Sequence, residues 1–157
     1  MYKVNQISDW ILSKTNIDAG DTISPLKLQK LLYYSQAWCL TIYNGTSLFE
    51  ERIEAWAHGP VVPSQYARFA DIPRENSIDI SKMELSIPKL DNQIDSLLNE
   101  VLDTYGEHSA SYLEKLTHQE SPWIIARKDL KPWERSTEEI TAESMIEYYT
   151  NLKVDGE

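Results

Sequence analysis

The chain has little of the residue types on which several protein classes depend. It contains one cysteine, Cys39, so an internal disulfide is excluded and a reducing compartment is expected. Only five of the 157 residues are glycine, and no glycine-rich loop of the kind that cradles nucleotide phosphates occurs. No apolar run approaches the roughly 20 residues of a membrane-spanning helix. The N-terminal residues also lack an apolar stretch of signal-peptide length, so we expect a cytoplasmic protein with no membrane association.

Recognisable catalytic and metal-binding patterns are missing as well. Neither Gly-x-Ser-x-Gly nor His-Glu-x-x-His occurs, and His58, His108 and His118 have no cysteine pair at metal-ligand spacing. Cys39 follows Trp38 on an apolar helix face, which is typical of a buried thiol rather than a nucleophile. We therefore predict that the protein is not an enzyme and has no catalytic residue, no metal site and no cofactor.

Acidic residues dominate the charge and are concentrated in two segments. The formal net charge is −10. Residues 91–107 carry five acids and no base, and residues 134–157 carry seven acids and two bases, so these segments account for the whole imbalance. This distribution argues against direct binding to nucleic acid and is compatible with a basic partner. A simpler interpretation is that both segments are solvated faces that aid solubility.

The residues that are present predict a mainly α-helical fold. A chain of 157 residues, 41% of them hydrophobic, can form one compact domain, which we place at residues 1–157. Ser-Pro pairs at residues 24–25 and 121–122 are typical of helix starts. Residues 18–21 and most of 71–90 are predicted as loops. Hydrophobic periodicity predicts six to seven helices, at about residues 3–15, 25–42, 61–70, 91–105, 109–118, 121–126 and, within the acidic C-terminal segment, 142–152.

A small β element is expected beside these helices. Residues 49–57 alternate apolar and polar side chains, which predicts one strand of a two- or three-stranded sheet. Its partner stays open between residues 78–80 and 86–88. The same alternation directs Trp56 away from the apolar side, and helical spacing does so for Tyr34, so both are expected at the surface.

Two ordered sets of short motifs run through the chain. The first comprises Leu28-Gln29-Lys30-Leu31-Leu32-Tyr33-Tyr34, Leu48-Phe49, Ile53-Glu54-Ala55-Trp56 and His58-Gly59-Pro60-Val61-Val62-Pro63. The second comprises Tyr105-Gly106, Ser109-Ala110, Leu116-Thr117-His118, Pro122-Trp123 and Ala126-Arg127. In this order, over about residues 28–127, they resemble the Panacea-domain, SocA-like antitoxin family, which includes phage-associated proteins. The structural signature positions are Gly59, Pro60, Pro63, Gly106, Pro122 and Trp123.

The resemblance implies a helical bacterial protein of a toxin–antitoxin system that neutralises a toxin by direct protein–protein binding. In one branch of the family the protein is instead an adaptor that delivers its toxin to a protease. The family has no established catalytic residues, and Cys39 stands where many relatives have a polar residue. Two functions of a different class stay open: a phage-associated hydrolase or nucleotide-modifying enzyme using His58 with an acid such as Glu54, and a transcriptional autoregulator, against which the acidic balance argues.

The candidate partner-binding residues are mainly aromatic or acidic. Aromatic side chains dominate the energetics of protein interfaces, and acids would complement a basic, nucleotide- or RNA-binding surface on the toxin. The oligomeric state stays open. The candidates are Tyr34, Trp56, His58, Tyr66, Asp95, Asp103, Glu143 and Glu147.

Overall fold

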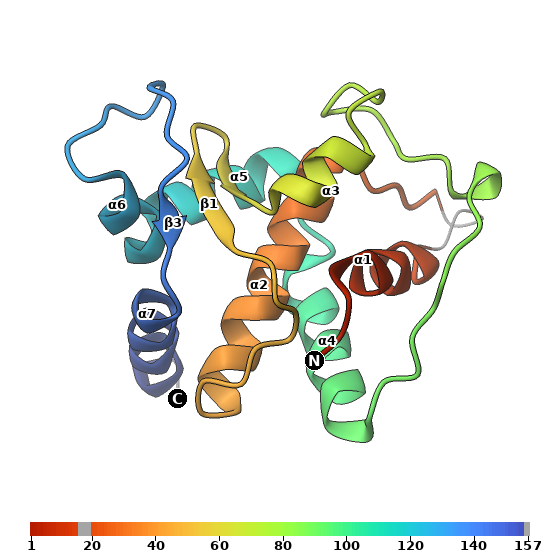
Figure 1. Ribbon diagram of the computed structural model, residues 1–157, viewed down its shortest axis with the longest axis horizontal. Coiled ribbons are helices and arrows are strands. Elements are labelled where there is room, and N and C mark those ends of the chain that lie inside the picture. Colours follow the sequence, from red (N-terminus) through yellow and green to blue (C-terminus); the bar gives the residue numbers. More distant parts are fainter. Residues whose placement is uncertain (16–19, 156–157) are drawn as a thin grey trace.

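The computed structural model describes residues 1–15 and 20–155. The loop predicted at residues 18–21 therefore lies partly outside the described residues, as do residues 156 and 157 of the acidic C-terminal segment. Within that range the chain forms one domain of seven α-helices and a small antiparallel sheet, which confirms the predicted fold class (Figure 1). The elements are α1 (Val4–Ser13), α2 (Pro25–Ile42), β1 (Ile53–Trp56), β2 (Gly59–Val61), α3 (Pro63–Arg68), the 3₁₀ helix η2 (Ile80–Lys82), α4 (Asn92–Tyr105), α5 (Ala110–Gln119), α6 (Ser121–Arg127), β3 (Glu139–Ile140) and α7 (Ala142–Asp155).

Helix α2 runs through the middle of the domain, and the other elements pack around it (Figure 1). The Lys27 N–H donates to the Ser24 hydroxyl, and Pro25 occupies the first turn, so the predicted start of this helix is confirmed. Helices α1, α3, α4, α5 and α7 and strand β2 all contact it. A helix surrounded in this way is covered on most of its circumference, and only its two ends reach solvent. The prediction that Tyr34 lies at the surface is therefore wrong, because its side chain is fully buried.

Strand β1 is the middle strand of the sheet, between β2 and β3. Ala55 lies opposite Pro60 of β2, and Ile53 lies opposite Ile140 of β3. Both partners predicted for β1, residues 78–80 and 86–88, are therefore wrong. A two-residue turn follows β1 and reverses the chain into β2. Gly59 begins β2 with φ of 106°, a backbone conformation that residues with a side chain rarely adopt. This hairpin also displaces the start of α3 from residue 61 to Pro63.

Local interactions define where the helices around α2 begin and end. The Asp91 and Ser109 side chains accept hydrogen bonds from backbone N–H groups in the first turns of α4 and α5. Gly106 follows α4, where a Cβ atom would lie 2.5 Å from the Leu102 carbonyl oxygen. Pro122 lies in the first turn of α6, and Trp123 is buried beneath it. Among the described helices, none has both the length and the hydropathy that crossing a membrane requires.

Candidate functional site

One candidate surface surrounds the turn between β1 and β2. The rings of Trp56 and Tyr66 meet edge to face with their centroids 4.8 Å apart, and His58 is exposed. These three predicted residues all line one groove of about 360 Å³, which we call the turn groove. The remaining lining is mostly apolar: Pro25, Leu26, Gln29, Val61, Phe69, Ala70, Ile72, Pro73 and Arg74. The structure therefore brings together three side chains that the sequence singled out separately.

A buried lysine supports this turn from below. Lys30 is fully buried, and its Nζ donates a hydrogen bond to the Pro60 carbonyl oxygen at 3.2 Å. A Cβ atom at Gly59 would lie 2.8 Å from Lys30 Cε and 3.0 Å from Thr117 Oγ1. Burial lowers the pKa of Lys30 to about 7, although the nearby Glu114 carboxylate opposes that shift. Glycine is thus required at position 59 by its φ angle and by the space that Lys30 occupies.

Side chains of helix α6 donate hydrogen bonds to the backbone of β1. The Trp123 Nε1 donates to the Trp56 carbonyl oxygen at 2.8 Å, and Arg127 donates to the Ala55 carbonyl oxygen at 3.0 Å. The Arg127 guanidinium also lies over the Trp123 ring, 4.7 Å from its centroid. The His118 ring stacks on Trp123 with centroids 4.0 Å apart. These contacts give the signature residues of the second motif set a structural role beneath the turn.

His58 is paired with an acid that the sequence did not suggest. Its Nδ1 lies 3.0 Å from Glu114 Oε1 of α5. Glu54, the acid suggested as an example of such a partner, instead accepts a hydrogen bond from Trp56 Nε1 at 2.9 Å and pairs with Arg52 at 3.4 Å. His58 therefore has an acid beside it, but this acid is not the suggested Glu54, because residues two apart on a strand share a face, which directs Glu54 to Trp56. The His58 side chain remains 49% exposed, so the pair is part of the surface.

Tyr34 belongs to a buried hydrogen-bonded cluster instead of a surface. Tyr34 donates to Glu120 Oε1 at 2.7 Å, and Tyr149 donates to the same oxygen at 2.9 Å. Because the single hydroxyl hydrogen of Tyr149 is donated to Glu120, the Tyr33 hydroxyl is the donor in the remaining hydrogen bond, which joins it to the Tyr149 oxygen at 3.0 Å. Burial raises the pKa of Glu120 to about 7, against the effect of its two tyrosine partners. The cluster joins α2 and the α5–α6 junction to α7.

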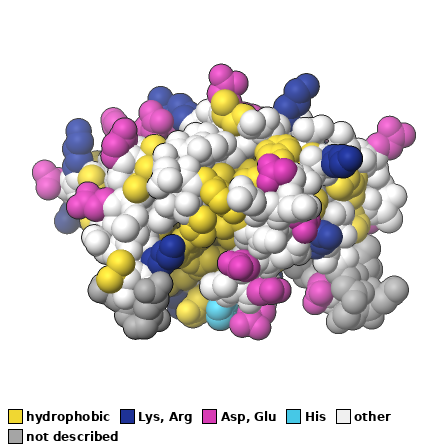
Figure 2. Space-filling model, turned by 90° about the horizontal axis from the view of Figure 1, so that it is seen from below, with side chains coloured by type: hydrophobic (Ala, Val, Ile, Leu, Met, Phe, Trp, Pro, Cys, Tyr) yellow, Lys and Arg dark blue, Asp and Glu magenta, His cyan; other side chains and the backbone are white. Residues whose placement is uncertain are grey.

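A second candidate surface lies between α4 and α7, over the C-terminal half of α2. A groove of about 250 Å³, which we call the α4–α7 groove, is lined by side chains of all three helices. Figure 2 shows a strip of hydrophobic side chains across this face of the molecule, with acidic side chains beside it. Ile42 at the end of α2 is 37% exposed. The lining residues are Trp38, Ile42, Leu97, Glu100, Val101, Thr104, Tyr105 and Lys153.

The four acids predicted to bind a partner are exposed, but none of them lines this groove. Asp95 and Asp103 belong to α4, and Glu143 and Glu147 belong to α7. The acid that does line the groove is Glu100, which sequence reasoning missed as a site residue. Its spacing of three residues from Leu97, a buried residue of the same helix, was the available signal.

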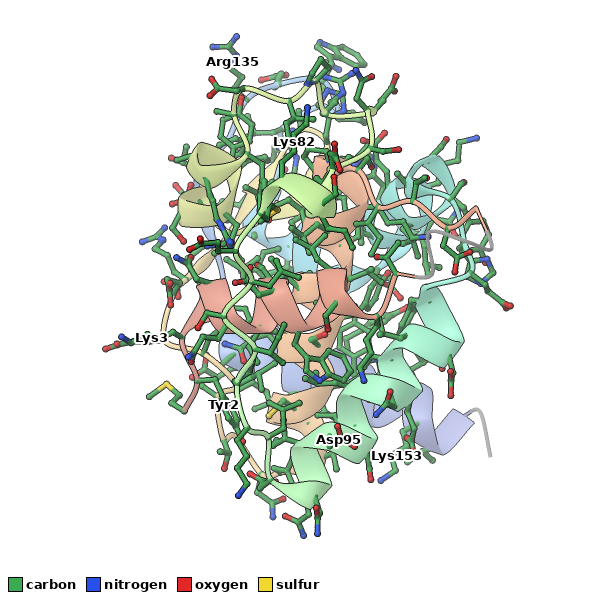
Figure 3. The ribbon with its side chains drawn as sticks, turned by 90° about the vertical axis from the view of Figure 1, so that its right-hand side faces the viewer. Tyr2, Lys3, Lys82, Asp95, Arg135 and Lys153 are labelled. Atoms are coloured by element: carbon green, nitrogen blue, oxygen red, sulfur yellow. The ribbon has the colours of Figure 1, made fainter. Side chains whose placement is uncertain are left out.

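Charged side chains project at both ends of the molecule. Figure 3 shows Asp95 on α4 and Lys153 on α7 at one end of the molecule, and Lys82 and Arg135 at the opposite end. In the described parts of the chain, no three His, Cys, Asp or Glu side chains gather closely enough to hold a metal ion. What the two grooves offer is apolar surface with a few polar groups at the edges, which suits binding of another molecule.

Comparison with known proteins adds one finding. A model of the family described as "Antitoxin SocA-like, Panacea domain" matches residues 28–124. The match covers more than half of the chain and contains most of α2 and the whole of the β1–β2 turn, α3, α4 and α5. It ends within α6, so β3 and α7 lie beyond it. No curated protein and no solved structure matches the chain.

Proposed function

The chain belongs to the SocA-like antitoxin family with a Panacea domain, and we propose that it neutralises a cognate toxin by binding it directly. The family match over residues 28–124 is the observation that carries this proposal. Neutralisation by contact requires a stable scaffold with accessible apolar surface, because aromatic and aliphatic side chains supply most of the energy of a protein interface. The turn groove and the α4–α7 groove both supply such surface.

The acidic segments favour a partner whose binding surface is basic. Both α4 and α7 pack on α2, and residues of both helices line the α4–α7 groove. Asp95 and Asp103 on α4 and Glu143 and Glu147 on α7 are all exposed. Opposed charges accelerate association and favour the correct partner. The partner that suits this surface is a toxin with a basic nucleotide- or RNA-binding face.

The direct test is inhibition of the purified toxin, encoded next to this chain, by the purified protein without any protease. We expect stoichiometric inhibition and a complex that survives gel filtration. Inhibition that requires an added protease would assign the protein to the adaptor class instead. Turnover of a small molecule, lost in a folded His58→Ala variant, would favour an enzyme, and a promoter shift at physiological salt would favour a transcriptional regulator.

Charge reversal tests whether the exposed acids of α4 and α7 accelerate association with the toxin. The variant with Asp95, Asp103, Glu143 and Glu147 all replaced by lysine is expected to slow association at least tenfold at 50 mM salt, with a smaller effect at 500 mM. A matched control replaces four other exposed acids by lysine, with the same change in net charge: Glu50, Asp71, Glu75 and Glu84. Equal slowing by both variants would show that net charge alone matters and would remove the role of α4 and α7.

A further inference from the structure

The loop between α6 and β3, residues 128–138, projects from the edge of the molecule and is called the Trp133 loop below (Figure 1). Trp133 is 73% exposed, whereas the other four tryptophans of the chain are buried or half-buried. Three apolar residues close to it in the chain are exposed as well: Ile124, Ile125 and Leu130. An exposed tryptophan in such company is typical of a contact site for another molecule.

The Trp133 loop is supported from inside by the buried side chain of Arg127. The Arg127 Nη2 donates to the carbonyl oxygens of Lys131, at 2.8 Å, and Glu134. Its Nη1 donates to the Ala55 carbonyl oxygen of β1, which ties the loop to the sheet. The backbone on both sides of Trp133 is thus directed inward to the guanidinium, so the indole between them is left pointing outward.

The loop begins with a backbone conformation that a lysine rarely adopts. Lys128, the first residue after α6, has φ of 54° and ψ of −123°. Residues with a side chain persist in this region only where the surrounding structure holds them there, and the Arg127 hydrogen bonds provide that support. A loop held in this way loses less conformational entropy when a partner binds it.

The charge directly beside Trp133 is positive. The Lys131 Nζ lies 5.8 Å from the centroid of the Trp133 ring. Arg135, two residues after Trp133, is exposed at one end of the molecule (Figure 3). Within the described ranges, neither base forms an ion pair. The acid between them, Glu134, is half-buried and accepts a hydrogen bond from the Lys131 N–H. A carboxylate on an occupant is therefore favoured at the edge of the indole.

The wider charge distribution favours a protein over a nucleic acid or an anionic membrane. The whole Trp133 loop has three bases and three acids, and the net charge of the chain is −10. Extended arrays of phosphate are therefore repelled by the protein and gain no net attraction from the loop. A protein pocket with one carboxylate at its edge meets mainly the local charge, because exposed charges more than about 10 Å apart are screened at 0.1 M salt.

We propose that Trp133 is the anchor by which this chain selects its toxin: the indole enters an apolar pocket of the toxin, and Lys131 pairs with a carboxylate at the edge of that pocket. This assignment rests on the proposed function, because it names the residue that recognises the toxin. The loop lies outside residues 28–124, which match the family model. A contact there is free to vary without disturbing the shared domain, which suits the choice of one partner over another.

The affinity of the purified chain for the purified toxin encoded next to it tests the anchor. Trp133→Ala is expected to weaken binding about tenfold or more, and Trp133→Phe less, because it keeps an aromatic ring. Lys131→Glu is expected to weaken binding severalfold at 50 mM salt and less at 500 mM. The matched control is Tyr112→Ala, since Tyr112 is a 48% exposed aromatic residue on α5. Thermal melts confirm that each variant folds. Equal affinities of Trp133→Ala and Tyr112→Ala would overturn the proposal.

Quenching of tryptophan fluorescence by acrylamide shows whether the toxin covers Trp133. At saturating toxin, the difference between the natural chain and Trp133→Phe isolates the Trp133 signal, because the other tryptophans contribute to both. We expect this signal to be accessible to acrylamide in the free chain and protected in the complex. A signal that stays accessible in the complex would contradict the assignment. Protection by phosphatidylserine vesicles or single-stranded DNA, without protection by the toxin, would also overturn it and assign the loop to lipid or nucleic acid.

Toxin inhibition separates this inference from the proposed function. If Trp133→Ala loses inhibition that Tyr112→Ala keeps, the Trp133 loop is the recognition site. If Trp133→Ala inhibits the toxin as well as the natural chain does, the assignment of the loop is wrong while the antitoxin function stands. If the natural chain itself neither binds nor inhibits the toxin, the proposed function and the assignment fail together.

Discussion

The turn between β1 and β2 and the groove between α4 and α7 are built in opposite ways. The turn is supported by buried polar groups, with Lys30 bonded to the Pro60 carbonyl and Arg127 bonded to the Ala55 carbonyl. The α4–α7 groove has an uncharged floor, and its charges stand at the rim in solvent. Changes at the turn should therefore act mainly on stability, whereas changes at the groove should act mainly on binding.

The family match divides the two regions in the same way. Residues 28–124 include the whole turn and the lysine beneath it, but only one wall of the groove. The other wall, α7, lies beyond the match and is tied to the core through Tyr149 and Glu120. The turn is thus part of the domain that defines the family, and the groove is completed by a helix outside it.

The largest effect is expected from Gly59→Ala. The new Cβ atom would meet Lys30 at 2.8 Å in a backbone with φ of 106°, so we expect unfolding to become easier by about 2–4 kcal/mol. Gly45→Ala is the matched control, because Gly45 has φ of 87° but open space around it, and about 1 kcal/mol is expected there. Urea unfolding measures both. Equal losses would show that the close approach to Lys30 is unimportant.

Lys30→Met is expected to change how stability depends on pH. The folded chain releases the Lys30 proton near pH 7, whereas the unfolded chain keeps it to about 10.5, so the unfolded state binds more protons in this window. The stability of the natural chain should therefore rise with pH relative to the variant, by up to ~1.4 kcal/mol per pH unit. Unfolding free energies at pH 6.5 and 9 measure the difference. Parallel curves would contradict the buried position of the amine.

Glu120→Gln tests the buried cluster that joins α7 to the core. Its effect on the pH dependence of stability is expected to be opposite in sign to that of Lys30→Met. The pKa of Glu120 is raised from 4.5 to about 7, so the folded state binds more protons between these values and the natural chain loses stability as pH rises through them. Glutamine keeps a carbonyl oxygen for Tyr34 and Tyr149 and has no charge to desolvate. We expect the variant to gain about 1–2 kcal/mol relative to the natural chain between pH 4.5 and 8. Denaturant titrations at both pH values measure this gain, and a relative loss would refute it.

Ile42→Lys is expected to have the smallest effect on stability. Its side chain is 37% exposed at the last residue of α2, where a positive charge is favourable to the helix dipole, so the change should stay within about 0.5 kcal/mol. The same urea titration measures it. A fall in the free energy of unfolding by more than about 1 kcal/mol would contradict the contrast between the turn and the α4–α7 groove, because the groove would then contribute to folding as the turn does.

Sequence reasoning succeeded where neighbouring residues decide the structure. The Ser24-Pro25 start of α2 and the approximate bounds of α4 and α5 were readable, since capping involves residues within one helical turn. Cys39 is a buried core thiol, as its apolar neighbours predicted. The errors concerned partners far along the chain: β3 pairs with β1 across more than 80 residues, and no local pattern marks that register.

The candidate site was only partly readable for the same reason. Trp56, His58 and Tyr66 were identified singly from their residue types, and the groove that unites them depends on where α3 packs. Tyr34 was misplaced because a helical period reveals the most apolar face but not whether the opposite face is also covered. Glu100 was overlooked because its spacing from Leu97 places it beside the buried face of α4, but only the packing of α2 and α7 shows that a groove lies there.

The sequence alone determined most of the helices, the Ser24-Pro25 start of α2 and the acidic character of two segments, because each depends on side chains within a few positions of one another. Only the tertiary structure decided that Lys30 lies under Gly59, that Glu114 faces His58 and that α4 and α7 flank one groove. These outcomes depend on how helices distant in sequence pack on α2, where burial of apolar surface, rather than local preference, selects the arrangement.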